Sequence, residues 1–278
     1  MPKLSTDYNL SIVKKPFSYN TITEFLISQP LTIDVEIDDQ YSGCFSVKGI
    51  EFEATVLYVG LTDFARLSIE LSPAEMHIYL NMFLVWIRES LLTERFCVLE
   101  RFLDNGVVLL FSTRFGSDDP FVDALQVARW IGDHDAMKFC PALGIASGKV
   151  MAGFTGTPKE YSATVFGSPL IFAAGCARHN PQGDVSSMIT FPADEWKERS
   201  FDKVFQPIEY DDPEKGKVKQ PQTWKLGEPR EIDFSGMGRL ALRDIANVVH
   251  SMPSVSAEIK AREWAQLIRD KGFYKKNV

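Results

Sequence analysis

The stretch GIASGKVMAGFTGTPKEYSATVFG, residues 144–167, contains short apolar segments separated by glycine-containing turns. Residues 142–146 and 150–154 are predicted to be strands on either side of a Ser-Gly-Lys turn. Gly-Thr-Pro at residues 156–158 marks a second turn, which leads to a third predicted strand at residues 163–166. This part of the chain therefore predicts β-structure joined by tight turns.

Upstream of this stretch the sequence predicts a strand, a long helix and a hairpin. Residues 52–59 are rich in β-branched and aromatic residues, as expected for a buried strand. Ser72 is expected to be the N-cap of the helix, and Glu75 completes a capping box with it. The apolar runs 97–103 and 107–111 are separated by Asp-Asn-Gly, a strong hairpin signal. The apolar stripe of the helix is predicted to belong to the core, and it comprises Met76, Leu80, Phe83, Ile87 and Leu91.

The order of the elements indicates an α+β fold. A second helix is expected to begin near Asp119-Pro120, and a short third helix is expected from Pro169 to Arg178. From residue 52 to about residue 190 the order is therefore strand, helix, hairpin, helix and further strands. This order fits a twisted, mainly antiparallel sheet with helices on one face, and it does not fit a doubly wound parallel sheet.

The chain divides into a core domain and extensions. Residues 1–50 form an N-terminal extension that includes a strand-like alternation, and residues 51–205 form the core domain. Residues 206–231 are rich in Asp, Lys, Pro and Gln and are predicted to be an exposed excursion. Residues 232–278 form a C-terminal extension of strand and helix. The helical pattern at residues 257–271 is predicted to pack on a partner subunit.

Composition excludes several classes of protein. A net charge of −7 argues against a protein that wraps a nucleic-acid backbone. The sequence has no apolar run approaching the roughly 18 residues that cross a bilayer, and its start lacks an apolar signal core. These features predict a cytoplasmic protein with no membrane partner. The cysteines form no CxxC pair and are expected to be buried reduced thiols, and they are Cys44, Cys97, Cys140 and Cys176.

Three segments resemble the catalytic domain of the class III adenylyl and guanylyl cyclases, and their order and spacing agree with the family pattern. TVLYVGLTDFARLS at residues 55–68, followed by LSP at 71–73, resembles the family pattern VLFADIRGFTRLS then LSP. LERFLDNGV at residues 99–107 is similar to DKFIGDGV. Residues 144–158 are similar to GIHTGEV and GNVGSP, and TVFG at 164–167 is similar to TVIG. The resemblance covers about half of the chain and implies a ferredoxin-like (βαββαβ) cyclase domain with N- and C-terminal extensions.

The family reaction joins the ribose 3′-hydroxyl to the α-phosphate of a nucleoside triphosphate and releases pyrophosphate. The resemblance implies two Mg²⁺ or Mn²⁺ ions, bridged by two aspartates. Those aspartates fall at Gly60 and Asn105, which carry no carboxylate. Asp63 and Asp104 are the candidate replacement metal ligands. Alternatively, Asp63 caps the following helix and Asp104 belongs to the hairpin turn.

The base-reading pair of the family corresponds to Arg101 and Ser168. An arginine side chain only donates hydrogen bonds, so Arg101 would read a carbonyl such as uracil O4 or guanine O6, and it would reject an exocyclic amine. The bulk of neighbouring phenylalanines favours uracil over guanine, which makes UTP the predicted substrate. The alternative is that Arg101 is a solvated strand residue.

The asparagine and arginine that stabilise the transition state in the family fall at Ile171 and Gly175. Arg178 lies one helical turn beyond Gly175 and is the candidate catalytic residue, although an arginine near a helix C-terminus is also an ordinary surface feature. Lys149 is a candidate phosphate contact. By their place after the first metal position, the remaining candidate substrate contacts are Leu61, Thr62 and Phe64.

These observations lead to one main functional hypothesis and two alternatives. In the main one, the chain is a pyrimidine cyclase that converts UTP to cyclic UMP, similar to the bacterial branch that makes uridylate or cytidylate signals against phage. A homodimer with the site at its interface is then expected. In the first alternative, the chain is an inactive pseudo-cyclase that binds nucleotide or regulates a partner. In the second, it is an oligomerisation module that supplies half of a heterodimeric site.

Overall fold

A computed structural model describes residues 19, 21–39, 43–62, 64–91, 97–103, 105–135, 139–157, 160–180, 187–206, 209–212, 216–219, 223–234, 236, 238–247 and 257–270. Within these ranges the side chains at 33–39, 43–47, 89–91, 99–103, 157, 160–161, 209–212 and 257–258 lie outside the description. The helices are α1 (Ile22–Ser28), α2 (Phe64–Glu70), α3 (Pro73–Leu91), α4 (Pro120–Asp133), α5 (Ser168–Arg178), α6 (Phe201–Val204) and α7 (Ala257–Asp270).

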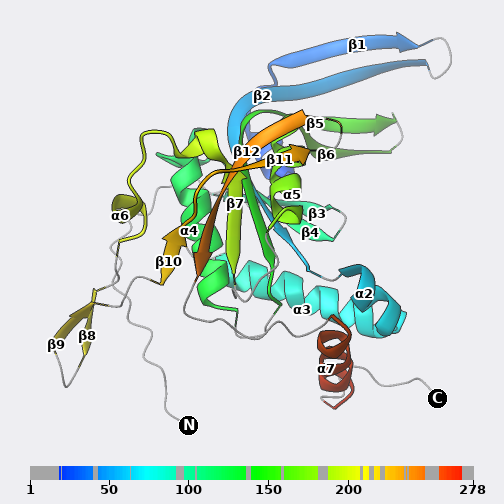
Figure 1. Cartoon of the computed structure of the whole chain (residues 1–278). Coiled ribbons are helices and arrows are strands. Elements are labelled where there is room, and N and C mark those ends of the chain that lie inside the picture. The colour runs from blue at the N-terminus through cyan, green and yellow to red at the C-terminus, as the bar shows by residue number, and fades with distance from the viewer. Residues whose placement is uncertain are drawn as a thin grey trace, which may run out of the picture.

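The strands build one large sheet and one small ribbon (Figure 1). The strands of the large sheet are β1 (Ile33–Asp39), β2 (Gly43–Gly60), β3 (Cys97–Leu103), β4 (Gly106–Phe111), β5 (Ala142–Thr157), β6 (Glu160–Phe166), β7 (Met188–Pro192), β10 (Trp224–Leu226), β11 (Arg230–Phe234) and β12 (Gly238–Asn247). The ribbon pairs β8 (Glu209–Asp212) with β9 (Gly216–Lys219).

The main path through the large sheet runs β10-β12-β7-β5-β2-β4-β3. Among the described pairings, β5 with β7 is parallel and the other neighbours are antiparallel. The predicted hairpin of β3 and β4 is present, and the predicted α+β fold with a mainly antiparallel sheet is confirmed.

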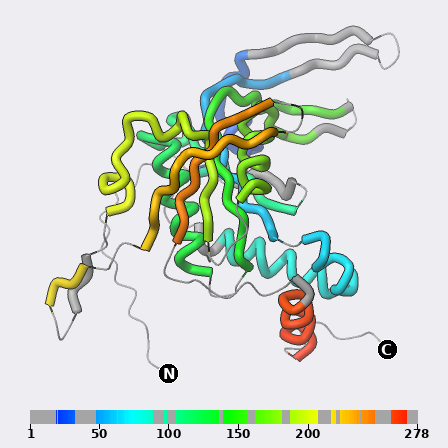
Figure 2. The backbone as a smooth tube through the Cα atoms, viewed as in Figure 1, coloured from blue at the N-terminus to red at the C-terminus, as the bar shows by residue number. Residues whose placement is uncertain are grey.

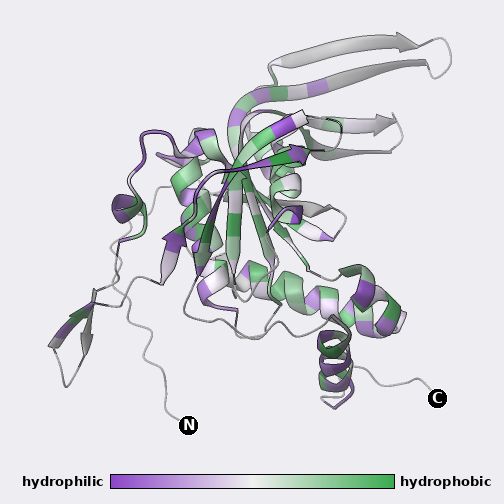
Figure 3. Ribbon diagram, viewed as in Figure 1, coloured by the Kyte–Doolittle hydropathy of each residue, from purple (hydrophilic) through white to green (hydrophobic). Residues whose placement is uncertain are grey.

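Helices cover both faces of the sheet, whereas the sequence pattern predicted helices on one face. On one face, Leu57 and Val59 of β2 belong to a core cluster with residues of α3, α4 and α7. On the other face, Val56 and Tyr58 belong to a cluster with residues of α1 and α5. The central strands are therefore buried on both sides, which explains why β4 is a continuous apolar run. Figure 3 shows hydrophobic residues concentrated on these central strands.

The predicted turn within residues 147–149 is not a turn. β5 continues through it as one strand and pairs with β2 along its whole inner part, from Ala142 to Phe154. Gly148 has a φ of 150°, a value that side-chain-bearing residues rarely adopt. Glycine thus lets the strand pass this irregular position, where sequence alone suggested a break.

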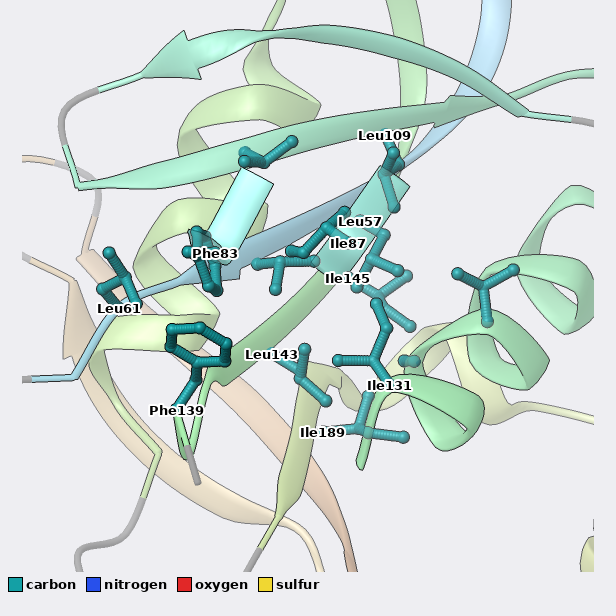
Figure 4. Close-up of a cluster of buried hydrophobic side chains, with 14 of the residues drawn as sticks. Leu57, Leu61, Phe83, Ile87, Leu109, Ile131, Phe139, Leu143, Ile145 and Ile189 are labelled. Carbon is teal, nitrogen blue, oxygen red and sulfur yellow. The ribbon is translucent and has the colours of Figure 1, made fainter. Parts of the chain in front are cut away.

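The predicted capping box at the start of α3 is confirmed. The Ser72 N–H donates to Glu75 Oε2 at 2.8 Å, and the Glu75 N–H donates to Ser72 Oγ at 3.3 Å. Phe83 and Ile87 of α3 are fully buried against the sheet, as the predicted stripe requires. Figure 4 shows both side chains among Leu57, Leu109 and Ile145.

One feature of the C-terminal half differs from the predictions. Trp224 lies inside the predicted exposed excursion, yet it is 1% exposed, because β10 joins the main sheet and its indole N–H donates to Asp133 Oδ1 at 2.9 Å. The helix α7 packs on α2 and α3 of its own chain (Figure 2), and its packing on a partner subunit stays a prediction. Its Trp264 ring lies 4.8 Å from Tyr79 and 4.9 Å from Phe139 between ring centroids. In the described part of the chain, no helix combines the length and apolarity needed to cross a membrane.

Candidate functional site

The ends of β2 and β4 bring together the two positions where the cyclase resemblance places metal ligands. Gly60 is the last residue of β2 and pairs with Gly106 of β4, and Asn105 directly precedes Gly106. Beyond the strand, the Leu61 N–H donates to the Asn105 carbonyl at 2.8 Å. The predicted neighbourhood of positions 60 and 105 is therefore present.

The Asn105 side chain is engaged by neighbouring groups of the same chain. The Tyr58 hydroxyl donates to Asn105 Oδ1 at 2.8 Å, and Asn105 Nδ2 donates to the Leu61 carbonyl at 3.0 Å. Tyr58 is 3% exposed, and this bond satisfies the hydroxyl of a buried ring. The amide thus joins β2 to the hairpin turn through neutral hydrogen bonds.

The Tyr58 ring occupies the space above both glycines. A Cβ atom built at Gly60 would lie 2.8 Å from Tyr58 Cε1, and one built at Gly106 would lie 2.5 Å from Tyr58 Cζ. Both distances are shorter than real Cβ contacts, so a side chain at either position would collide with the ring. An aspartate side chain could not be accommodated at position 60 while Tyr58 keeps this position.

These residues do not fit a two-metal centre. Mg²⁺ and Mn²⁺ prefer carboxylate and other oxygen ligands. Gly60 offers no side-chain oxygen, and the Asn105 amide is already bonded within the chain. Among the residues that the structure describes, no three or more His, Cys, Asp or Glu side chains gather as metal ligands would. Asp63 and Asp104, the predicted replacement ligands, lie outside the described residues.

The other predicted substrate contacts near Gly60 are occupied with local packing. Leu61 is 2% exposed and its side chain belongs to the main core. The Thr62 hydroxyl donates to the Cys140 carbonyl at 3.0 Å, and Phe64 packs partly buried against the same core. Substrate binding by these three residues stays a prediction.

Arg101 lies on the backbone at a β-bulge. The pairing of β3 with β4 shifts register between Glu100 and Phe102, which leaves Arg101 as the extra residue. Such bulges redirect a side chain and occur often beside functional sites. The side chain of Arg101 is outside the description, so its predicted contact with a base is untested.

The predicted residues of α5 and β5 fall at two different ends of the sheet. Lys149 pairs with Glu53, seven residues before Gly60, which is on the order of 20 Å along the strand. α5 starts beside Lys149, because a Cβ at Gly167 would lie 2.7 Å from the Lys149 carbonyl oxygen. The helix then runs toward Gly144, where Ala177 makes the close approach.

The exposed Arg178 at the end of α5 therefore lies toward the end of the sheet that holds Gly60, since Gly144 pairs with Tyr58. Ser168, also exposed, lies at the opposite end with Lys149. The Lys149 Nζ is 3.2 Å from Glu51 Oε1, an exposed ion pair. Within one chain the structure brings Arg178 toward the Gly60 end, and it does not bring Lys149 or Ser168 there.

A second aromatic ring covers the position where the family has its transition-state arginine. A Cβ built at Gly175 would lie 2.2 Å from Phe234 Cε1, and Phe234 is 3% exposed. Ile171, at the position of the family asparagine, is 60% exposed and apolar. The chain therefore has no polar side chain at either of the two positions where the family has its transition-state asparagine and arginine.

A partly buried ion pair joins β11 to β12, and its arginine also bonds to the end of α5. Arg230 Nε is 2.6 Å from Asp244 Oδ2, and Arg230 Nη2 donates to the His179 carbonyl at 2.6 Å. The Thr190 hydroxyl also donates to Asp244 Oδ1, at 2.6 Å. Because Asp244 is 8% exposed and well bonded, this network fixes β11 on β12, and the Arg230 bond to His179 links β11 to the end of α5.

Two further titratable groups near α5 have shifted pKa values. Burial, with a smaller effect of the Asp244 charge, raises the pKa of the Cys176 thiol to about 12, so the thiol stays protonated and unreactive. Burial also raises the pKa of Glu195, whose Oε1 accepts the Ser147 N–H at 2.7 Å. Glu195 thereby satisfies a backbone donor on the edge of β5, which is a structural role.

Sequence reasoning missed Tyr58 and Phe234, the two residues that decide this site. For Tyr58 a signal existed, because residues 58 and 60 of a strand face the same side. For Phe234 no local signal existed, because it lies far from Gly175 in the sequence.

Comparison with known proteins agrees with this architecture. No family model and no curated protein matches the chain. Among solved structures, the guanylyl cyclase Cya2 superposes with a TM-score of 0.53 at 16% identity, covering 72% of this chain and 94% of that one. The catalytic core of a rhodopsin-guanylyl cyclase with converted specificity, in complex with ATPαS, gives 0.52 at 14% identity, covering 72% and 98%. The adenylyl cyclase CyaB from P. aeruginosa gives 0.50 at 14% identity, covering 75% and 99%. The chain therefore has the fold of adenylyl and guanylyl cyclase catalytic domains.

Proposed function

We propose that this chain is a catalytically inactive member of the nucleotidyl cyclase fold, which binds nucleotide or regulates a partner cyclase domain without cyclising a substrate itself. The observation that carries this proposal is the Tyr58 ring packed over Gly60 and Gly106, with Asn105 bonded to its hydroxyl. A packed aromatic ring likewise takes the place of a catalytic side chain where Phe234 covers Gly175.

Cyclisation requires groups that stabilise negative charge. Cyclisation places negative charge on the attacking ribose oxygen and on the departing pyrophosphate, and cations and donors must stabilise that charge. Here the position of one bridging carboxylate is a glycine, the other is a neutral amide, and the arginine position is a covered glycine. Loss of even one such group lowers rates by roughly 10²–10³-fold, and the losses here affect several groups at once.

The test is a product assay. Purified protein is incubated with each of the four nucleoside triphosphates and either MnCl₂ or MgCl₂, and products are resolved by mass. An active cyclase serves as the positive control, and nucleotide binding is followed separately by calorimetry. We expect no cyclic mononucleotide with any substrate. Formation of a cyclic product above the buffer background contradicts the proposal.

A second candidate function is uridylate cyclisation, with cyclic UMP as an antiviral signal. The observation that favours it is the position of Arg101 at a β-bulge, together with a cyclase fold that spans almost the whole of the solved catalytic cores. Metal would then be held by Asp63 and Asp104, and Arg178 would contact the phosphates. Mn²⁺ or Mg²⁺ and a homodimer with the site at its interface belong to this candidate.

The product assay also distinguishes this candidate. It predicts cyclic UMP and pyrophosphate from UTP, abolished by Asp104→Ala and strongly reduced by Arg101→Ala at unchanged melting temperature. Light scattering at micromolar concentration should then show a dimer. Turnover of ATP in preference to UTP contradicts the base assignment, because Arg101 has no acceptor for an amine.

A further inference from the structure

The Tyr58 side chain fills a space that two facing glycines leave at the end of the sheet. Gly60 and Gly106 are paired across β2 and β4, and neither contributes a side chain. Residues 58 and 60 share one face of β2, so the ring of Tyr58 lies over Gly60 and reaches Gly106. The smallest side chain at either glycine would collide with it.

The ring has little freedom to leave this space. Gly144 is the cross-strand partner of Tyr58 on β5, and α5 approaches so closely there that a Cβ would lie 2.0 Å from the Ala173 carbonyl oxygen. Tyr58 also belongs to the buried cluster that contains Ala173 and Ala177 of α5. The Tyr58 ring is thus buried at 3% exposure, and the hydrogen bond to Asn105 holds its hydroxyl.

The bonded amide of Asn105 completes a neutral link between three segments. Its Oδ1 accepts from Tyr58 in β2, its Nδ2 donates to the Leu61 carbonyl after β2, and its own carbonyl accepts the Leu61 N–H. These hydrogen bonds join the two strand ends without any charge. A divalent cation at this place would need several oxygen ligands at about 2.0–2.6 Å, and a carboxylate side chain at position 60 that could supply one would collide with the ring.

We infer that Tyr58 is the residue that excludes a divalent cation from this end of the sheet and that replaces it as the link between β2 and β4. The inference rests on the proposed function and deepens it, because it names the side chain that occupies the place of the missing carboxylate at Gly60. It follows that carboxylates restored at positions 60 and 105 will not bind metal while Tyr58 is present. They will bind it once the ring is removed.

The experiment compares four proteins by titration with MnCl₂ alone, followed by electron paramagnetic resonance of the free ion. They are the wild type, the variant Tyr58→Ala, the variant Gly60→Asp/Asn105→Asp, and the triple variant that combines these changes. We expect Mn²⁺ binding in the triple variant at least tenfold tighter than in the other three. The single variant Tyr58→Ala is the matched control, because it opens the space and adds no carboxylate.

Two results separate failure of this inference from failure of the proposed function. If Gly60→Asp/Asn105→Asp binds Mn²⁺ as tightly as the triple variant, Tyr58 does not exclude the ion and the inference is overturned. If the wild type binds Mn²⁺ and loses it in Asp63→Ala or Asp104→Ala, the proposed function fails, because the chain then holds a metal elsewhere.

A stability measurement covers the case in which the triple variant does not fold. Gly60→Ala is made in the wild type and in Tyr58→Ala, and the melting temperatures are compared. We expect Gly60→Ala to lower the melting temperature clearly in the wild type and to change it little when the ring is absent. Equal effects in both backgrounds would show that Tyr58 does not occupy the space above Gly60, and would overturn the inference.

Discussion

The ion pair between Glu75 and Arg269 joins α3 to the C-terminal helix α7, and its removal should destabilise the protein in a pH-dependent way. Arg269 Nε lies 2.6 Å from Glu75 Oε1, and Glu75 is 2% exposed. The hydrogen bond from Arg269 is the main cause that lowers the pKa of Glu75 from 4.5 to about 2, with the Ser72 N–H contributing and burial opposing. We therefore choose Glu75→Gln, which keeps the shape and removes the charge.

The expected magnitude follows from the pKa shift. A shift of this size, at about 1.36 kcal/mol per pKa unit, corresponds to roughly 3 kcal/mol. Arg269 is 55% exposed, so water screens part of the interaction, and we expect about 2 kcal/mol. Because the folded protein holds Glu75 as a carboxylate, the stabilisation is complete above pH 4.5 and is lost as the pH falls from 4.5 toward 2.

Urea denaturation followed by tryptophan fluorescence at pH 7 and at pH 3 measures this effect. The free energy of unfolding of Glu75→Gln should be about 2 kcal/mol below that of the wild type at pH 7, and the difference should shrink at pH 3. The matched control is Glu70→Gln, which removes a partly exposed ion pair with Arg66 and should cost less than about 1 kcal/mol. A difference for Glu75→Gln that is equal at both pH values would refute the reasoning.

Two further predictions concern α5. Phe234→Ala should lower the free energy of unfolding by about 3–5 kcal/mol, because it removes the buried ring against Gly175, whereas Phe166→Ala, at a 53% exposed ring, should cost far less. Urea denaturation of both variants checks this, and a neutral Phe234→Ala would mean that β11 does not depend on the contact. Cys176 should resist iodoacetamide at pH 8 until the protein unfolds, because its pKa is about 12 and it is fully buried. Peptide mapping, with the half-buried Cys97 as reference, measures this, and equal labelling of both thiols in the folded protein would contradict it.

The sequence by itself determined the features that depend on neighbours within a few residues. The capping box of Ser72 and Glu75 and the hairpin at Asn105-Gly106 could be predicted because their hydrogen bonds form locally. The order of elements was sufficient for the α+β class, and the ordered motifs were sufficient for the cyclase fold. The absence of carboxylates at positions 60 and 105 was also evident from the residues alone.

Only the tertiary structure decided how the chain uses these positions. Which faces of the sheet carry helices depends on where α1 and α5 dock, and strands buried on both sides give no alternation that could reveal it. The contact of Phe234 with Gly175 joins two distant segments, and the hydrogen bond from Arg230 of β11 to the His179 carbonyl supports it. Whether position 60 has room for a side chain depends on whether a ring or an open space lies above it. Tertiary packing decides this, because the presence of a glycine in the sequence does not indicate which neighbour fills the volume that its missing side chain leaves.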